Sequence, residues 1–282
     1  MIIAVLLTAV ICIAGTYVLI NGNSGGNNNS NNVSIVATGS TTVMPLMTEF
    51  QEEFEKHSKV TISISGGGSG VAAPGVRNGS ADIGMLSRDP TATERDLRSL
   101  IIAKDGVVVI VGANTGVTNL TLEQIAKIYQ GEYTNWNQVG GTDQAIRPVI
   151  REDGSGTRDC IDTAMKTVAG FNTNNYNNYP SQSSTGSMIS SVTGTQGSIG
   201  YVNLGAIKDL GSATPLTVNG VQATPENVIN GSYASLSRNL VLLTGNNPST
   251  ATQSFLNWIM SAQGQAIVEA EGFVPLPKTD RP

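Results

Sequence analysis

The chain has 282 residues, of which 39% are hydrophobic, 13% are charged and 32 are glycines. This composition is typical of a globular, turn-rich protein, excludes an intrinsically disordered chain, and is long enough for two domains with separate apolar cores. The formal net charge of −5 and the lack of a lysine- or arginine-rich cluster argue against a nucleic-acid partner, which requires a clustered basic surface.

Two cysteines and one histidine leave little for metal or nucleophilic chemistry. Cys12 and Cys160 stand far apart along the chain, and their number excludes both a disulfide framework and a zinc site. His57 follows the acidic stretch EEFEK at the end of a predicted helix, where we expect an exposed side chain. Serine–histidine or cysteine–histidine catalysis would depend on this residue alone. We therefore predict no catalytic residue, no metal site and no cofactor.

The N-terminus combines an apolar segment with a polar one. Residues 1–20 carry no charged side chain and match the length that spans a bilayer, which favours an uncleaved membrane anchor over a cleaved signal. Bulky Val10 and Ile11 precede Cys12, so we expect a buried cysteine rather than a lipidated one. Residues 21–33 are rich in Asn, Gly and Ser, which is typical of a flexible tether. This arrangement predicts an extracytoplasmic body anchored at the outer face of the cell membrane.

From Ser34 onward, strand and helix patterns alternate. The first set contains predicted strands at 34–38, 59–65, 81–86 and 106–112, and predicted helices at 41–58 and 91–100. The second set contains strands at 146–150, 197–204 and 239–244, helices at 120–131, 156–170 and 249–272, and an asparagine-rich surface loop at 170–184. This alternation predicts an α/β fold with a largely parallel sheet covered by helices on both faces. At this length, it predicts two α/β lobes joined by extended crossings.

Three turns rich in glycine and hydroxyl side chains lie between predicted strands and helices. They are TGSTT at 38–42, SGGGSG at 65–70 and REDGSGTRD at 151–159. Glycines let several backbone N–H groups point to one spot, and a following helix N-terminus adds partial positive charge, so such turns favour phosphate or sulfate. Hydroxyl donors would come from Ser40, Thr41, Ser69, Ser155 and Thr157. The simpler alternative is that the hydroxyls cap helices and the glycines only form turns. None of the three turns matches the nucleotide-binding loop that ends in Gly-Lys-Ser/Thr.

Charged residues near these turns predict a preference among anions. Arg151 opens the third turn and offers a planar donor fork to tetrahedral oxygens, and we expect Asp153 to brace it through a salt link. Asp82 stands at a predicted buried strand, where a carboxylate needs a partner. Facing the site, Asp82 would accept a hydrogen bond from protonated phosphate and repel fully ionised sulfate. The alternative is an exposed Asp82 at a helix cap or a strand edge.

Several motifs, taken in order, resemble a known family. TGSTTVMPL, SGGGSG, ADIGMLSR, REDGSGTRD, GSIGYV and GQAIVEAEGFVPL are similar to segments of the phosphate-binding receptor of the phosphate ABC importer, in the periplasmic binding protein superfamily. The similarity runs from about Ser34 to Leu276. It implies a two-lobed type II (Venus-flytrap) α/β fold with two mixed or parallel sheets, in which lobe 1 comprises 34–110 and 239–282 and lobe 2 comprises 111–238. It also implies a monomer that closes on inorganic phosphate and delivers it to a membrane-embedded ABC permease.

The resemblance also implies roles for individual residues. The ligands from lobe 1 would be the donors Ser40, Thr41, Thr42 and Ser69, together with Asp82 as acceptor of the phosphate proton. The ligands from lobe 2 would be Arg151, Ser155, Gly156 and Thr157. Residues expected close to the cleft are Gly39, Gly68, Ser87, Arg88 and Asp153. Glu152 departs from the family pattern, in which a small polar residue is common, and adds a negative charge beside the site.

Three other functions fit parts of the pattern. A receptor for sulfate, molybdate or tungstate would use the same turns, although Asp82 argues against it. A surface phosphatase would act on phosphoesters, but the sequence offers no metal-ligand cluster and no activated nucleophile. A structural or adhesive surface protein is suggested only by the predicted tether.

Overall fold

The computed structural model describes residues 33–168 and 170–280. The predicted anchor at 1–20 and tether residues 21–32, including Cys12, lie outside the described residues. Within the described part, no helix is long and apolar enough to cross a membrane. The three glycine-rich turns and all predicted site residues are described.

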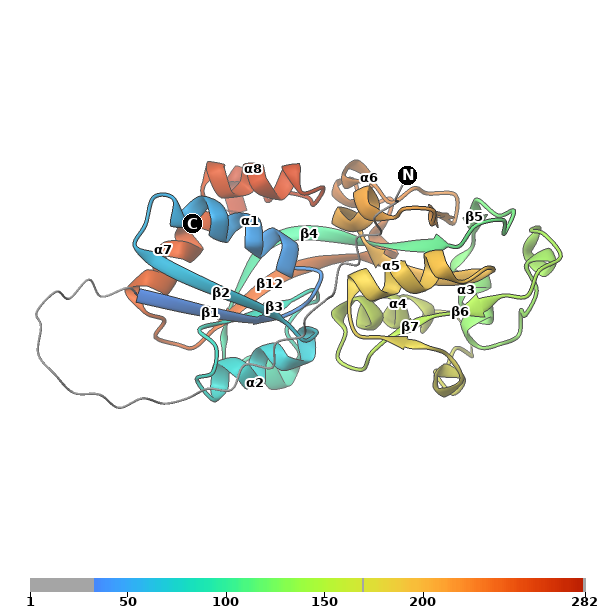
Figure 1. Cartoon of the computed structure of the whole chain (residues 1–282), viewed down its shortest axis with the longest axis horizontal. Helices are drawn as coiled ribbons and strands as arrows, with labels where there is room; N and C mark the ends of the chain where they lie inside the picture. Colours follow the sequence, from blue (N-terminus) through green and yellow to red (C-terminus); the bar gives the residue numbers. More distant parts are fainter. Residues whose placement is uncertain (1–32, 169, 281–282) are drawn as a thin grey trace, which may run out of the picture. The chain divides into compact units, whose positions relative to one another are not determined.

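Most strands join one mixed, eight-stranded sheet (Figure 1). Its order is β2-β1-β3-β12-β4-β9-β6, with β10 pairing the end of β4. β1 is parallel to β2 and β3, whereas β12 is antiparallel to β3 and β4, and β9 is antiparallel to β4. The bounds are β1 (Val33–Gly39), β2 (Val60–Gly66), β3 (Ile83–Leu86), β4 (Arg98–Val111), β6 (Arg147–Pro148), β9 (Ser198–Asn203), β10 (Thr214–Pro215) and β12 (Ser237–Thr244). Two short pairs stand apart, β5 (Asn119–Leu120) with β11 (Thr217–Val218) and β7 (Ile150–Arg151) with β8 (Ser181–Gln182).

One hydrophobic core lies between the sheet and helices from both ends of the body. Met47 and Phe50 of α1 (Met44–Glu55) pack with Ile35 of β1 and Phe255 of α7 (Thr250–Ile259). α8 (Ala262–Ala270) packs against α1 and α7, whereas α2 (Ala72–Arg77) packs against β3 and β12 on the opposite face (Figure 1). We call the structure around this core lobe 1.

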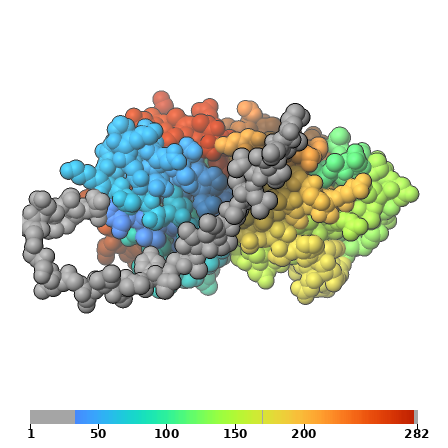
Figure 2. Space-filling model, viewed as in Figure 1, coloured from blue at the N-terminus to red at the C-terminus, as the bar shows by residue number. Residues whose placement is uncertain are grey.

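A second hydrophobic core is built from the middle of the chain. Val109 of β4 and Tyr201 of β9 pack there with Tyr129, Trp136 and Ile161. The helices around it are α3 (Leu122–Tyr129), α4 (Gly156–Met165), α5 (Thr185–Gly194) and α6 (Pro225–Ile229). We call this structure lobe 2. In Figure 2, the blue and red surfaces gather on one side and the green to orange surfaces on the other, which matches the two cores.

The α/β class, with a mixed sheet flanked by helices, is confirmed. The largely parallel sheet predicted from the alternation is wrong, because β4 and β12 are antiparallel to their neighbours. The two predicted sheets are continuous because β4 is 14 residues long and pairs with β12 through its first part and with β9 through its last. The predicted helix at 91–100 is wrong. Its capped start forms only a single 3-10 turn at Ala92–Glu94, and Arg98 already begins β4 because Ser99 and Leu100 pair with β12.

Candidate functional site

The three predicted turns meet where lobe 1 faces lobe 2. The Gly70 N–H of the second turn donates to the Gly154 carbonyl of the third at 2.9 Å. The hydroxyls of Thr42, in the first turn, and Thr157, in the third, lie 3.1 Å apart. The first two turns follow the carboxyl ends of β1 and β2, and the third follows β7. Ligands of α/β proteins bind at such carboxyl ends, so we call this meeting point the junction.

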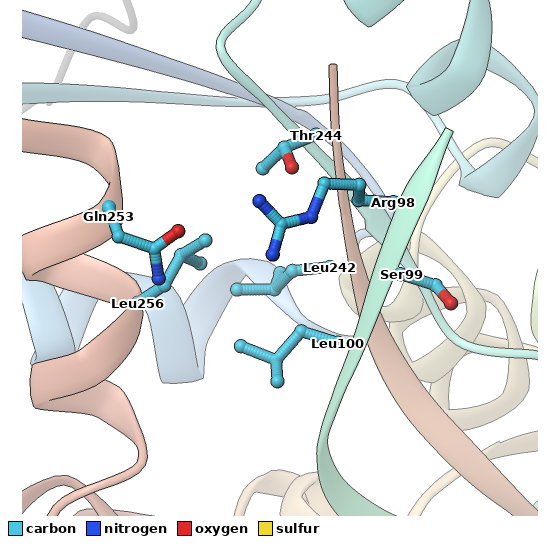
Figure 3. A pocket seen from close by; sticks show the side chains of 7 residues that line it. All are labelled: Arg98, Ser99, Leu100, Leu242, Thr244, Gln253 and Leu256. Carbon is cyan, nitrogen blue, oxygen red and sulfur yellow. The ribbon is translucent and has the colours of Figure 1, made fainter. Parts of the chain in front are cut away.

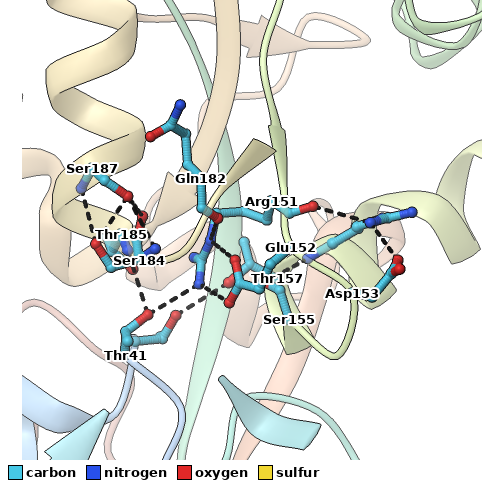
Figure 4. A network of polar contacts seen from close by, with 12 residues as sticks. Thr41, Arg151, Glu152, Asp153, Ser155, Thr157, Gln182, Ser184, Thr185 and Ser187 are labelled. Carbon is cyan, nitrogen blue, oxygen red and sulfur yellow. Dashed lines mark hydrogen bonds and ion pairs between the residues drawn. The ribbon is translucent and has the colours of Figure 1, made fainter. Parts of the chain in front are cut away.

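Arg151 is the central charged group of the junction (Figure 4). Its side chain is 2% exposed, and its backbone N–H donates to the Tyr201 hydroxyl at 3.0 Å. Nη2 donates to Thr41 Oγ1 at 3.1 Å, while the Glu152 carboxylate accepts from Nε and Nη2 at 2.7 and 2.8 Å. Nη1 is buried and has no hydrogen-bond partner among the described residues. One nitrogen of a buried guanidinium, with two N–H groups, therefore remains for a ligand.

Strand β8 helps to fix this arginine. Gln182 of β8 pairs with Arg151, and its carbonyl accepts from Arg151 Nε at 3.1 Å. The segment was predicted to be a surface loop, but Tyr176 within it is buried and donates to Asp162 of α4 at 2.5 Å. The asparagine-rich stretch is thus partly structural, since it supports the strand that holds Arg151.

Hydroxyl side chains from both lobes are buried at the junction. They are Ser40, Thr42, Ser69, Ser87, Ser155 and Thr157. The capping alternative holds for Ser155, which caps α4 by accepting the Arg158 N–H at 3.3 Å. Ser40 Oγ accepts the Thr42 N–H at 3.2 Å within the first turn. A hydroxyl that accepts one bond still has an O–H to donate. Capping and anion binding are therefore compatible in these turns.

Glycines let the two lobes approach at the junction. Gly68 has φ +81°, which favours glycine, and a Cβ there would lie 3.0 Å from Glu152 Oε1 of the other lobe. Gly156 is the first residue of α4, and a Cβ there would lie 2.6 Å from both Ser69 Oγ and Ser87 Oγ. Gly39 passes directly against the backbone of β3. The start of α4 therefore contacts lobe 1 without an intervening side chain.

Arg88 lies beside the junction and links the lobes. Its Nη1 donates to Glu94 at 2.6 Å, and its Nε lies 3.0 Å from the carboxylate of Asp159 in α4. The hydrogen bond that Arg88 donates to the Glu94 carboxylate raises the pKa of Arg88, so the guanidinium stays charged. Because its guanidinium pairs with the carboxylates of both Glu94 and Asp159, Arg88 is placed to hold the lobes together rather than to offer a free donor.

Asp153 does not brace Arg151, so that prediction is wrong. Its side chain is 95% exposed and pairs with Arg158 Nη1 at 2.6 Å (Figure 4). Glu152 takes the bracing position because it directly follows Arg151 and its longer side chain returns to the guanidinium. Arg158, held by Asp153, also donates to the Arg151 carbonyl at 3.1 Å and so supports the turn from outside.

Asp82 does not lie at the junction, and its predicted role as proton acceptor is wrong. The residue is exposed, and its Oδ2 accepts the backbone N–H of Val36 at 2.9 Å. Ala37 pairs with Ile83 and Gly39 with Met85, so Asp82 precedes β3 at its amino end, whereas the first turn follows β1 at its carboxyl end. The alternative of an exposed Asp82 is correct, and the residue lies at the amino end of β3, a strand in the interior of the sheet.

Two charged residues at the junction were missed by sequence reasoning. Arg238 Nη2 lies 3.4 Å from Thr42 Oγ1, and Asp105 binds the same guanidinium at 2.7 Å. Asp105 lies within β4 and Arg238 within β12. In the sequence each directly precedes an apolar run, at 106–112 and 239–244, which was the available signal. The Thr185 N–H at the start of α5 also donates to Thr41 Oγ1, at 3.4 Å.

Of three cavities in the described part, two border the junction and one does not. The cavity in Figure 3 has a volume of about 80 Å³ and lies within lobe 1 between β4, β12 and α7; no predicted site residue lines it. Two larger cavities, of about 630 and 590 Å³, border the junction. Thr41 lines the first, and Arg88 and Arg238 line the second.

Groups suited to nucleophilic or metal chemistry are sparse in the described part. Burial raises the pKa of the Cys160 thiol to about 11, so the thiol stays protonated at neutral pH. His57 is exposed, as predicted, and lies 3.7 Å from a Glu53 carboxylate oxygen. Among residues 33–168 and 170–280, no group of three or more His, Cys, Asp or Glu side chains is arranged to hold a metal ion.

Three comparisons with known proteins all find similarity to binding proteins of the PBP superfamily. The profile of the PBP superfamily domain matches residues 25–263. Phosphate-binding protein PstS of Borreliella burgdorferi is 31% identical over 258 residues, covering 87% of this chain and 91% of the relative. Among solved structures, that of a candidate phosphate ABC transporter substrate-binding protein with bound phosphate, from Clostridium perfringens, is 37% identical with a TM-score of 0.80, covering 86% of this chain and 100% of that chain. An ABC-type phosphate transport receptor from Vibrio cholerae is 29% identical with a TM-score of 0.69, with coverage of 86% and 100%. The chain therefore belongs to the PBP superfamily and, within it, to the family of phosphate-binding proteins PstS.

Proposed function

We propose that the protein is an extracytoplasmic receptor that captures inorganic phosphate between its lobes and delivers it to a membrane-embedded ABC permease. The observation that carries this proposal is Arg151, which is buried with an unpartnered Nη1 beside hydroxyls from both lobes. The names of the relatives support phosphate as the ligand, and so does the bound phosphate of the related structure. The segment at 1–20 would anchor the receptor, a monomer, at the outer face of the membrane.

The proposed ligands surround a tetrahedral anion with donors. Arg151 supplies the charge, the start of α4 supplies backbone N–H groups at Gly156 and Thr157, and hydroxyls complete the shell. These hydroxyls belong to Ser40, Thr41, Thr42, Ser69, Ser155 and Thr157. Gly39 and Gly68 keep the turns close, while Ser87 and Arg88 support the junction from lobe 1.

Closure of the lobes would couple binding to transport. We propose two moving bodies that are connected through β4 and β12. The first comprises 34–110 together with 239–282, and the second comprises 111–238. Because the donors come from both bodies, phosphate has its full set of partners only when they meet, and binding shifts the equilibrium toward the closed form. The permease would recognise that form.

Glu152 replaces Asp82 as the carboxylate proposed to favour a protonated anion. Its oxygens lie at the Arg151 guanidinium, in contact with the predicted site. Phosphate retains a proton near neutral pH and can donate a hydrogen bond from its P–OH group to a carboxylate, whereas sulfate has no such proton. A carboxylate beside the anion therefore disfavours sulfate through repulsion.

Titration calorimetry of the purified protein with phosphate, sulfate, molybdate and tungstate tests the proposal. We expect saturable binding of one phosphate per chain and much weaker binding of the other three anions. Preferred binding of another oxyanion would support a different receptor. Absence of anion binding, together with turnover of a chromogenic phosphoester, would instead support the phosphatase alternative.

The same titration tests which carboxylate, Glu152 or Asp82, determines the preference for phosphate over sulfate. Glu152→Gln is expected to reduce the preference for phosphate over sulfate, because the acceptor of the phosphate proton is lost. Asp82→Asn is the matched control and should leave the preference unchanged, since Asp82 is exposed and bonded to Val36. A loss of selectivity in Asp82→Asn, with none in Glu152→Gln, would reverse this assignment.

A further inference from the structure

A second buried arginine lies where the chain crosses between the lobes. Arg238 of β12 is 8% exposed and stands directly opposite Asp105 of β4. Asp105 Oδ2 accepts from Arg238 Nε at 2.8 Å and lies 2.7 Å from its Nη2, while Oδ1 accepts the Leu204 N–H at 3.0 Å. Because both carboxylate oxygens are engaged, Asp105 holds the Arg238 guanidinium in one orientation.

This orientation directs Arg238 to the junction. Nη2 lies 3.4 Å from Thr42 Oγ1, and Thr42 lies 3.1 Å from Thr157 Oγ1 of the other lobe. Arg151 makes the equivalent contact with Thr41 at 3.1 Å. The adjacent threonines of the first turn therefore each contact one buried guanidinium.

Buried guanidinium nitrogens without a hydrogen-bond partner indicate where a ligand would bind. In the described part, the buried side-chain nitrogens without a hydrogen-bond partner are Arg88 Nε, Arg151 Nη1 and Arg238 Nη1. Arg88 Nε has the Asp159 carboxylate at 3.0 Å, so its charge is compensated. The other two belong to the guanidinium groups at Thr41 and Thr42. A buried donor without protein partner or solvent is unfavourable, and a ligand oxygen would satisfy both.

We propose that Arg238 is a second guanidinium ligand of the bound phosphate, with Nη1 donating to a phosphate oxygen. The inference rests on the proposed function, since it adds a ligand to the same site. Asp105 and Glu152 each balance one arginine, so the donor geometry, more than net positive charge, would stabilise the anion. Phosphate would then contact both lobes and the crossing strand at once. The alternative is that Arg238 only neutralises Asp105 and stabilises the crossing.

Two sets of variants distinguish these roles. Arg238→Gln alone leaves Asp105 buried without its partner, so the double variant Asp105→Asn/Arg238→Gln removes both charges together. Arg238→Lys keeps a cation for Asp105 but loses the planar fork. The matched control is Arg77→Gln/Asp96→Asn, which removes an exposed ion pair of 2.6 Å that includes none of the predicted site residues. Each protein is melted without phosphate to establish that it is folded, and then titrated with phosphate.

We expect both Arg238 variants to raise the Kd for phosphate about tenfold, the lower end for a hydrogen bond to a charged group. The control double variant should bind like the wild type. A folded Arg238 variant with a wild-type Kd would overturn the inference, while loss of binding in Arg151→Gln would leave the proposed function intact. If wild-type protein bound no phosphate, the proposed function itself would fail.

A crystal structure of the wild-type protein grown with phosphate needs no variant and decides the matter if both variants unfold. The expected result is Arg238 Nη1 within about 3 Å of a phosphate oxygen. Density for phosphate at Arg151, with Arg238 Nη1 bonded only to water or protein, would contradict the inference.

Discussion

Replacing Arg151 with glutamine is expected to weaken phosphate binding by roughly 30- to 5,000-fold, equivalent to about 2–5 kcal/mol for losing a buried charged partner. The reason is that Arg151 is buried, is fixed by Tyr201, Gln182 and Glu152, and has Nη1 free for an anion. Glutamine cannot supply the charge or the fork. Calorimetric titration with phosphate measures the change.

The double variant Arg151→Gln/Glu152→Gln separates two causes of this loss. In the single variant, Glu152 is left without its cation and could repel the anion. If the guanidinium itself binds phosphate, the double variant should remain defective. Arg77→Gln, an exposed arginine paired with Asp96, changes the net charge equally and should bind normally. Recovery of wild-type binding in the double variant would show that Arg151 serves only to neutralise Glu152.

Gly156→Ala is expected to weaken phosphate binding by roughly 5- to 150-fold, because overpacking costs about 1–3 kcal/mol. Its Cβ would lie 2.6 Å from Ser69 Oγ and Ser87 Oγ, so the lobes could not approach as closely. In the proposed open form the two lobes would stand apart at this point, so the melting temperature without phosphate should barely change. Titration and small-angle scattering, with and without phosphate, would measure affinity and contraction.

Gly186→Ala is the matched control for Gly156→Ala. Gly186 lies in the first turn of α5, and a Cβ there would have no heavy atom within 4 Å apart from its chain neighbours and helix backbone. This variant should bind phosphate and contract like the wild type. Normal binding and contraction in Gly156→Ala would show that the start of α4 does not approach lobe 1 in the bound form.

The sequence predicted the junction because its features are local. Glycines and hydroxyls follow β1 and β2 directly, and Ser155 caps α4, so the three turns carry their own geometry. The same reasoning, applied fully, would have preferred Ser87 to Asp82. Ser87 follows the apolar run Ile83–Leu86 at the carboxyl end of β3, where α/β proteins bind ligands, whereas Asp82 precedes it.

The remaining site residues depend on contacts that sequence patterns do not contain. The pairing of Arg238 with Asp105 needs the register of β12 against β4, across 133 positions of sequence. Glu152, and not Asp153, pairs with Arg151, and this depends on the direction in which the turn points each side chain. The helix predicted at 91–100 failed for a similar reason, because pairing with β12 outweighed a capped start.

The most direct test of the account is a crystal structure of the protein grown with arsenate, a tetrahedral analogue of phosphate whose arsenic atom gives an anomalous signal. The account predicts one strong anomalous peak enclosed between the lobes, within hydrogen-bonding reach of Arg151, Thr41 and Thr157. A peak elsewhere on the molecule, or none at the junction at saturating arsenate, would contradict it.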